Sequence, residues 1–432
     1  MTTALATGTF VSKQATAAIP APAPSPLLDG YREVASDGGI FTFLTSFQGS
    51  HGGAPLNQPI VSMASTPDGQ GYWLVASDGG IFNYGDAGYF GSHGGAPLNK
   101  PIVGMAATPD GRGYWFVASD GGVFNYGDAG YFGSHGGSPL NKPIVGIAAT
   151  KDGNGYWLVA SDGGIFNYGD AGYDGSHGGS PLNKPIVGMS ATSDGDGYWM
   201  VASDGGIFNY GDASYLGSHG GTPLNQSIVG MAASNDGGGY WLVASDGGIF
   251  NYGDAPFRGS EGGSHLNKPI VGMSRGPLTF TDGTWVVDKD IPAETFHTTG
   301  TDACYWERDS DLSGSVNSII ANDIISGPDI VTVLGSDAAF KSDTCGQWSV
   351  MYTSGPQSTS FGDGVFAVGV DIAPGTYSTA GSGSCYWARL SDFTGNLNAI
   401  IANFDGAGPQ SVTISPGDDG FESQGCGVWT HQ

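Results

Sequence analysis

The chain is short of basic residues. Lys and Arg together number 14 among 432 residues, against 40 Asp and Glu, which gives a formal net charge of −26. Proteins that bind nucleic acids need Lys and Arg to neutralise phosphates, so this deficit argues against a nucleic-acid partner. It also argues against attraction to anionic membrane surfaces. Charged residues of both signs make up only 12% of the chain, and many of the acids are turn aspartates with a geometric role.

Long apolar runs, helical periodicity and catalytic motifs are lacking as well. No stretch of 18 apolar residues occurs, so we expect no membrane insertion. Gly accounts for 77 residues and no helical period is present, which excludes a helical repeat protein. No nucleophile elbow, phosphate loop or zinc-protease motif occurs. We therefore expect a protein that is not an enzyme, with no cofactor and no bound metal.

Residues 1–28 are polar and rich in Ala, Thr and Pro, which is typical of an extended arm or linker. This segment has neither the basic start nor the apolar centre of a signal peptide. If the protein is exported, we expect that a signal was removed ahead of this numbering or that export follows another route.

What the chain does contain is a 42-residue repeat. A Ser-Asp-Gly-Gly element begins at the following positions, with the first copy one residue out of register: Ser36, Ser77, Ser119, Ser161, Ser203 and Ser245. A repeat of this length is one supersecondary unit whose copies stack to bury what none can bury alone. Any site that the unit carries is present about six times, which favours multivalent binding over a single catalytic centre.

Each repeat predicts one blade of a β-propeller. In one copy, Asp-Gly turns separate four short runs, which are Ile60–Ser65, Tyr72–Ser77, Ile81–Tyr84 and Gly88–Ser92. Such turns between aromatic and β-branched runs indicate hairpins. Four antiparallel strands in about 42 residues match the size of one blade. The run Tyr72–Ala76 is apolar on both faces, as expected of a blade packed between two others.

The numbers of copies predict how the ring closes. The first unit, from Tyr31, lacks the Ile-Val-Gly-Met strand, whereas the last unit, after Glu261, has that strand and little else. We therefore expect an all-β fold with a six-bladed propeller over residues 29–276, in which Ile270–Met273 pairs with the strand that begins at Tyr31. Seven blades are the alternative, if the N-terminal arm adds strands.

After Gly283 the period changes. Cys304-Tyr305-Trp306 matches Cys385-Tyr386-Trp387, and the Thr-, Val- and Ile-rich runs around them predict two small β-sandwich modules, over residues 280–352 and 364–432. Each copy holds two of the four cysteines, and the equal spacing predicts the bridges Cys304–Cys345 and Cys385–Cys426. A bridge across such a loop stabilises a small module by about 4 kcal/mol in the chain-entropy model.

A zinc site is the other interpretation of these four cysteines. Structural zinc sites use closely spaced ligand pairs such as C-x-x-C, and the chain has none. We therefore expect disulfides, which form in an oxidising compartment or outside the cell. The predicted location is extracellular, on a cell surface or on a virion surface.

The blade pattern resembles the WD repeat. His51, the turn Asp68-Gly69, Asp78 and the run Phe82–Tyr84 stand where that family has its Gly-His pair, its first turn, its turn Asp and its next aromatic strand. The Trp-Asp dipeptide is missing. More closely, the unit is similar to tandem repeats of secreted actinobacterial cell-wall and surface proteins, and the C-terminal modules resemble small β-domains of the same kind of proteins. These resemblances imply a surface accessory role without a defined ligand.

The WD resemblance implies a structural role for a recurring His and Asp. The His before the first strand of a blade would bond the Asp of the next turn, with ligand binding or a metal as alternatives. The expected pairs are His51–Asp78, His93–Asp120, His135–Asp162, His177–Asp204 and His219–Asp246. At the sixth position Glu261 replaces His and would face Asp37, which places two like charges together.

A recurring Tyr and Asp form the candidate ligand site. An aromatic face can stack on a sugar ring while carboxylate oxygens accept bonds from its hydroxyls; the alternative is a packed blade edge. The candidates are Tyr84, Asp86, Tyr126, Asp128, Tyr168, Asp170, Tyr210, Asp212, Tyr252 and Asp254. We expect a non-catalytic adhesion protein that binds a cell-wall or surface glycan through repeated weak sites. The alternative is a structural component of a virion, filament or surface layer with protein partners.

Overall fold

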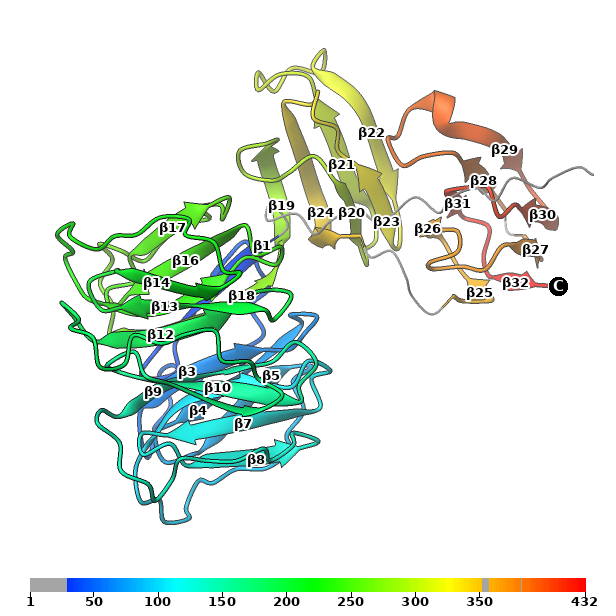
Figure 1. Ribbon diagram of the computed structural model, residues 1–432. Helices are drawn as coiled ribbons and strands as arrows, with labels where there is room; N and C mark the ends of the chain where they lie inside the picture. Colours follow the sequence, from blue (N-terminus) through cyan, green and yellow to red (C-terminus); the bar gives the residue numbers. More distant parts are fainter. Residues whose placement is uncertain (1–28, 352–356, 382) are drawn as a thin grey trace, which may run out of the picture.

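The computed structural model describes residues 29–351, 357–381 and 383–432. The predicted arm at residues 1–28 lies outside this part of the chain. The described chain is all-β apart from one short 3-10 turn, η2 (Leu397–Ala399). A propeller precedes two β-modules, which lie together beyond one edge of the ring (Figure 1).

The blades follow the repeat. One blade is formed by β3 (Ile60–Ser65), β4 (Gly71–Ala76) and β5 (Ile81–Gly85), paired in that order. Four further blades have the same order: β6 (Ile102–Ala107), β7 (Gly113–Ala118), β8 (Val123–Gly127); β9 (Ile144–Ala149), β10 (Gly155–Ala160), β11 (Ile165–Gly169); β12 (Ile186–Ala191), β13 (Gly197–Ala202), β14 (Ile207–Gly211); β15 (Ile228–Ala233), β16 (Gly239–Ala244), β17 (Ile249–Gly253). Every residue of β4 is buried, as its two-faced apolar sequence predicts.

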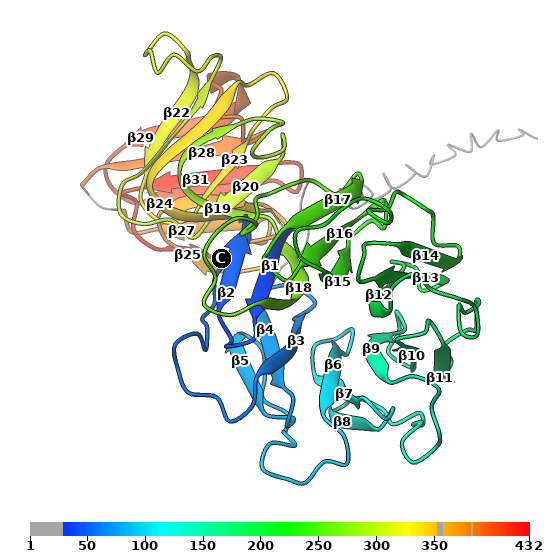
Figure 2. The ribbon, with the colours of Figure 1, turned by 90° about the vertical axis from the view of Figure 1, so that its left-hand side faces the viewer.

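The remaining blade closes the ring. It consists of β18 (Ile270–Pro277), β1 (Asp29–Ala35) and β2 (Ile40–Phe43), with β18 and β1 antiparallel over their whole length. The predicted closure by Ile270–Met273 is therefore confirmed, and residues 29–277 form six blades, not seven. The first strands of all six blades surround a central channel (Figure 2).

The prediction of four strands in each blade was wrong, because each described blade has three. The run Gly88–Ser92 forms no ladder. Gly85 and Gly91 have φ values of 67° and 136°, which glycine tolerates, and they turn this segment away from the blade edge. The chain between β5 and β6 is therefore a connection between blades.

Side chains hold these connections in place of a strand ladder. Trp73 Nε1 donates to the carbonyl of Gly88 at 2.7 Å within its own repeat, and the Tyr114 hydroxyl of the next blade donates to the carbonyl of Gly91 at 2.6 Å. Both side chains are fully buried. The tyrosine bond recurs at all six seams between blades, from Tyr31, Tyr72, Tyr114, Tyr156, Tyr198 and Tyr240.

The first module is one curved sheet of six strands. It comprises β19 (Thr279–Val286), β20 (Thr295–Thr298), β21 (Cys304–Asp309), β22 (Ile319–Ile325), β23 (Asp329–Thr332) and β24 (Ala339–Val350). The long strand β24 pairs with β19, β20 and β21. It thereby joins what would otherwise be the two sheets of the predicted sandwich.

The second module has those two sheets separate. One contains β25 (Ser360–Phe361), β32 (Trp429–His431), β27 (Gly375–Thr379) and β30 (Gln410–Ile414); the other contains β26 (Gly364–Ala367), β31 (Gly420–Gln424), β28 (Cys385–Leu390) and β29 (Ile400–Gly406). Here β31 and β32 take the place of the single strand β24, and β25 and β26 take the place of β19, so the two copies differ by a break in each of two strands.

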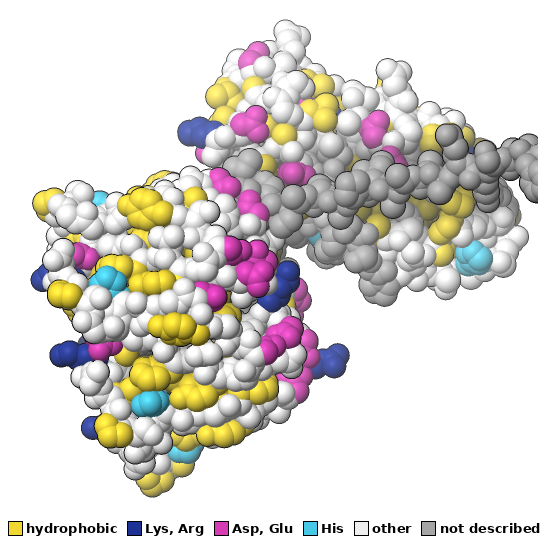
Figure 3. All heavy atoms as spheres, in the orientation of Figure 1, with side chains coloured by type: hydrophobic (Ala, Val, Ile, Leu, Met, Phe, Trp, Pro, Cys, Tyr) yellow, Lys and Arg dark blue, Asp and Glu magenta, His cyan; other side chains and the backbone are white. Residues whose placement is uncertain are grey.

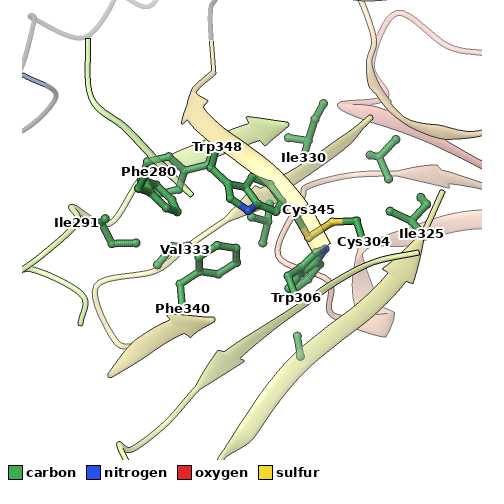
Figure 4. Close-up of a cluster of buried hydrophobic side chains, with 14 of the residues drawn as sticks. Phe280, Ile291, Cys304, Trp306, Ile325, Ile330, Val333, Phe340, Cys345 and Trp348 are labelled. Carbon is green, nitrogen blue, oxygen red and sulfur yellow. A yellow bond between two sulfur atoms is a disulfide. The ribbon is translucent and has the colours of Figure 1, made fainter. Parts of the chain in front are cut away.

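Both predicted disulfides are present. Cys304–Cys345 and Cys385–Cys426 are closed, with S–S distances of 2.03 and 2.08 Å. In the first module the bridge lies beside Trp306, Phe340 and Trp348, inside the core (Figure 4). In the described residues, no helix is long and apolar enough to span a membrane.

Reduction of the disulfides should lower the stability of the modules and leave that of the propeller unchanged, because the propeller contains no cysteine. We expect each module to lose about 4 kcal/mol on loss of its bridge, while the propeller's melting transition stays in place. Calorimetry with and without reductant measures this, and a Cys385→Ala/Cys426→Ala variant is the control for one module. A lower melting temperature of the propeller in the reduced protein would show that the propeller and the modules do not unfold independently.

Candidate functional site

Many polar and aromatic side chains of the repeat lie at the seams, where neighbouring blades contact each other. Tyr84, the first member of the predicted ligand row, is half-buried. Its ring lies 5.6 Å from that of Tyr72 by centroid, and a Cβ added at Gly49 would lie 2.5 Å from its Cδ1. The connection therefore packs against the ring, and Tyr72 lies beside it. Little of the ring is left for stacking on a ligand.

The aspartates of the predicted pairs have different partners. Asp86 is exposed, and its Oδ1 lies 3.2 Å from Thr66 Oγ1, which also donates to Asp68 at 2.8 Å. Burial and the neighbouring charge of Asp68 raise the pKa of Asp86, whereas backbone and hydroxyl donors lower that of Asp68. The same arrangement of two facing carboxyls recurs at Asp110–Asp128, Asp152–Asp170 and Asp194–Asp212.

The tyrosine hydroxyls approach histidines instead. Tyr126 Oη lies 3.5 Å from Nδ1 of His93, and Tyr252 Oη lies 3.3 Å from Nδ1 of His219. Over the visible side of the propeller, hydrophobic side chains and histidines are interspersed, whereas Asp and Glu gather toward the edge nearest the modules (Figure 3). The structure thus gives the two members of each predicted Tyr–Asp pair separate surroundings.

Asp194, Asp196 and Asp212 are three exposed carboxylates within 4.8 Å of one another.

The predicted His–Asp bonds need correction. In the described residues none of them is present: His51–Asp78, His93–Asp120, His135–Asp162, His177–Asp204 or His219–Asp246. Each Asp instead accepts from a backbone N–H in its own turn, at 3.0 to 3.1 Å.

The repeat register explains this difference. The backbone N–H of His51 donates to the carbonyl of Gly38, so the histidine lies beside the turn that precedes it in sequence. Its ring packs on Phe82 of the next blade, with centroids 4.2 Å apart, and its Nε2 lies 3.3 Å from the carbonyl oxygen of Pro55. The histidines therefore fill seams between blades.

A second aromatic row was missed from the sequence. Six side chains, one in each connection, have between 56% and 63% of their surface exposed: Phe47, Tyr89, Tyr131, Tyr173, Tyr215 and Phe257. They recur every 42 residues in a segment that the sequence predicted to be a strand, where alternate side chains are buried. The signal was an aromatic residue after Gly or another small residue at a fixed position of every repeat. We call these six residues the outer aromatic ring.

The outer aromatic ring lies beside the seam tyrosines. The Tyr89 hydroxyl is close enough to Tyr114 and Tyr126 that its charge, when ionised, would raise the pKa of both, in addition to the effect of burial. The same relation holds between Tyr131 and Tyr168. Four seams thus present an exposed tyrosine next to a half-buried phenol and a histidine, which is a combination of apolar surface and hydrogen-bonding groups. At the closing seam, Phe43 and Glu261 stand in place of the phenol and the histidine.

The closing blade departs from the repeat in its middle strand, β1. Arg32 stands where the other blades have Trp and is fully buried. Its Nε donates to the carbonyl of Ser46 at 3.1 Å, which replaces the tryptophan bond, and its guanidinium lies 5.1 Å from the ring centre of Tyr72. A further bond from Nη2 to the carbonyl of Gly69 ties this blade to the next.

Glu33, the next residue of β1, stands where the other blades have Leu, Phe or Met. It is also fully buried, and neither carboxyl oxygen has a hydrogen-bond partner among the described residues. A Cβ at Gly247 would lie 2.9 Å from Glu33 Oε2 and 2.5 Å from the Cβ of Glu261. The predicted meeting of like charges at Glu261 therefore occurs, but with Glu33 and Asp246, not with Asp37.

Comparison with known sequences bears on the modules. A family model described as the Rv1352-like extracellular domain matches residues 278–349 and 358–430, one match for each module. Uncharacterised proteins Rv1352 of Mycobacterium tuberculosis and Mb1387 of Mycobacterium bovis are each 35% identical to the chain over 82 residues, which cover 16% of this chain and 67% of each relative. The chain belongs to the Rv1352-like extracellular domain family. With its two disulfides, this Rv1352-like protein is extracellular.

Among solved structures, the chain is similar to the β-propeller domain of Cps50 (Swd1) from Myceliophteria thermophila. The match has a TM-score of 0.32 and 12% sequence identity, and it covers 44% of this chain. The chain spans 64% of that domain's length. The six-bladed architecture is established by the strand pairing of the chain itself.

The buried carboxyl of Glu33 predicts a pH-dependent seam. Burial, with the charges of Glu261 and Asp246, raises its pKa from 4.5 to about 8. The folded chain therefore keeps a proton that the unfolded chain loses, so stability falls as pH rises from 4.5 toward 8. Glu33→Leu introduces the residue that three other blades have at this position. It should stabilise the propeller by about 2–4 kcal/mol at pH 8 and by much less at pH 5.

Urea denaturation of the two proteins at both pH values measures this difference. The reverse change at a regular seam, Leu74→Glu, is the matched variant and should destabilise the propeller most at pH 8. An equal effect of Glu33→Leu at pH 5 and pH 8 would contradict a raised pKa at the closing seam.

Proposed function

We propose that the protein is a non-catalytic extracellular binding protein whose propeller adheres to a repetitive cell-wall or surface glycan. The observation that carries the proposal is the outer aromatic ring, because six large, exposed rings at equivalent positions form a repeated set of stacking surfaces. Isolated exposed apolar residues are ordinary on protein surfaces. A six-fold series, each beside a phenol or an equivalent aromatic, is a multivalent surface.

Multivalency suits a polymer ligand. A single aromatic face with a few hydroxyl partners binds one sugar weakly, but several sites on one rigid ring engage a repetitive polymer with a high effective concentration. The buried Tyr and Trp bonds to the connections fix the positions of the six aromatic residues, so little ordering entropy is lost on binding. A net charge of −26 favours neutral or cationic polymers over polyanionic ones.

The proposal is tested by removing four members of the ring together. In a Tyr89→Ala/Tyr131→Ala/Tyr173→Ala/Tyr215→Ala variant, we expect depletion by purified cell walls to fall by at least about tenfold, as avidity requires several sites at once. The matched control changes four exposed connection residues with the same period, Asn99, Asn141, Asn183 and Asn225, to Ala. It should bind as the unaltered protein does.

Release by soluble sugar distinguishes glycan binding from adhesion to protein. Bound protein should elute with fragments of the wall polymer and not with salt alone. Undiminished binding by the aromatic variant, or binding that protease treatment of the walls abolishes, would overturn the proposal and favour a structural role through protein contacts.

A further inference from the structure

A partly open cavity of about 280 Å³ lies at the contact between the two C-terminal modules. Trp306 lines it from the first module, and Tyr386 and Phe393 line it from the second. The modules are joined firmly here. Arg308 Nη1 donates to the carbonyl of Thr394 at 2.6 Å, and the backbone N–H of Thr332 donates to the carbonyl of Phe393 at 2.8 Å. The cavity is therefore part of a continuous structure that includes both copies.

Carboxyl groups from both modules face this cavity. Asp323 and Asp329 come from the first module, and Asp392 and Glu422 come from the second. Asp329 is buried and accepts from Trp306 Nε1 at 2.7 Å. No Lys, Arg or His lies among the residues that line the cavity. Acids that share a partly buried space with no cation are costly, since each charge loses part of its hydration without gaining a partner.

Three of these acids occupy positions at which the two copies of the module differ, whereas Asp392 corresponds to Asp311. Aligned through the cysteines, Asp323 corresponds to Phe404, Asp329 to Gln410, and Glu422 to Lys341. In the first module Lys341 pairs with Glu307 at 2.7 Å, whereas Glu422 accepts a hydrogen bond from Gln424 Nε2 at 2.8 Å. Divergence between the copies has thus placed carboxyls from both modules around one cavity.

We propose that this cavity binds a small organic cation with an alkylammonium group. The aromatic walls of Trp306, Tyr386 and Phe393 suit the methylene chain and attract the cation to their faces. The carboxyls of Asp323 and Glu422 accept charge-assisted hydrogen bonds from the ammonium. The size agrees with a molecule of several heavy atoms. This inference concerns the modules and does not depend on the function proposed for the propeller.

Other classes of ligand fit the cavity less well. A bare metal ion needs three or more ligand atoms close together, and the described residues offer such a group only at Asp194, Asp196 and Asp212, far from the modules in sequence. An anion would meet carboxyls with no compensating base. A neutral sugar would satisfy the hydrogen-bond acceptors but leave the buried charge uncompensated.

The direct test is calorimetric titration of the full chain with 1,5-diaminopentane, with 1,5-pentanediol as the uncharged analogue. We expect one diamine per chain and no heat from the diol. Glu422→Gln and Asp323→Asn keep the shape of the side chains and should each weaken binding by about tenfold or more. Asp302→Asn, an exposed acid of the same module outside the cavity, should have no effect.

Binding should also depend on pH in a defined direction. The titratable groups around the cavity are Asp323, Asp329, Asp392, Tyr386 and Glu422, and burial with the charge of Asp323 raises the pKa of Glu422 to about 7. An alkylammonium keeps its proton throughout this range. Affinity for the diamine should therefore rise from pH 5 to pH 8, with release of protons into the buffer.

A second ligand identifies the natural source of the ammonium group. If Nα-acetyl-lysinamide binds as well as the diamine, the site takes a lysine side chain of a protein; if only the diamine binds, it takes a free small amine. Equal binding of the diol, unchanged affinity in both carboxamide variants, or the absence of binding by either amine at about 10 mM would overturn the proposal.

Discussion

The propeller depends on the bond between one buried tyrosine and the connection that precedes its blade. Each blade has only three strands, so nothing in its own ladder holds the chain that crosses to the next. The hydroxyl of Tyr198, for example, donates to the carbonyl of Gly175, and Trp157 Nε1 donates to that of Gly172 three residues earlier. A blade therefore fixes the connection on one side through Trp and on the other through Tyr. The outer aromatic ring and the seam histidines take their positions from these two bonds.

Departures from the repeat occur where the ring closes. Arg32 keeps the donor function of the tryptophan it replaces and adds bonds to the neighbouring blade, so one departure strengthens a seam. Glu33 instead places a carboxyl without a hydrogen-bond partner in the seam on the other side of the closing blade. The same divergence between copies shapes the C-terminal modules, where acids unique to each copy meet at one cavity. In both parts of the chain, buried carboxyls lie where duplicated units differ, whereas the outer aromatic ring lies at equivalent positions of all six repeats.

The sequence predicted the blades from turn glycines and apolar runs, which are local features. It predicted the closure from the number of copies of each strand, and both disulfides from the equal spacing of the cysteines. It did not predict the course of the connections. Gly88–Ser92 has the composition of a strand, but its partners are the side chains Trp73 and Tyr114, which no periodicity reveals. That error hid the exposure of Tyr89. The His–Asp pairs failed for a related reason, since the register of the chain places His51 at the preceding turn. The cavity between the modules depends on packing that sequence alone does not specify.

The measurement that tests this account most directly is hydrogen exchange of a Tyr198→Phe variant, followed by mass spectrometry. The peptide around Asp174 is unique among the repeats, so its exchange can be assigned. Loss of a buried hydrogen bond costs about 1 kcal/mol, and a connection without its own ladder has little else to hold it. The account predicts faster exchange over residues 171–180, with strands β10 and β13 still protected. Unchanged exchange in that segment would show that the tyrosine bond does not hold the connections, and would contradict the central claim.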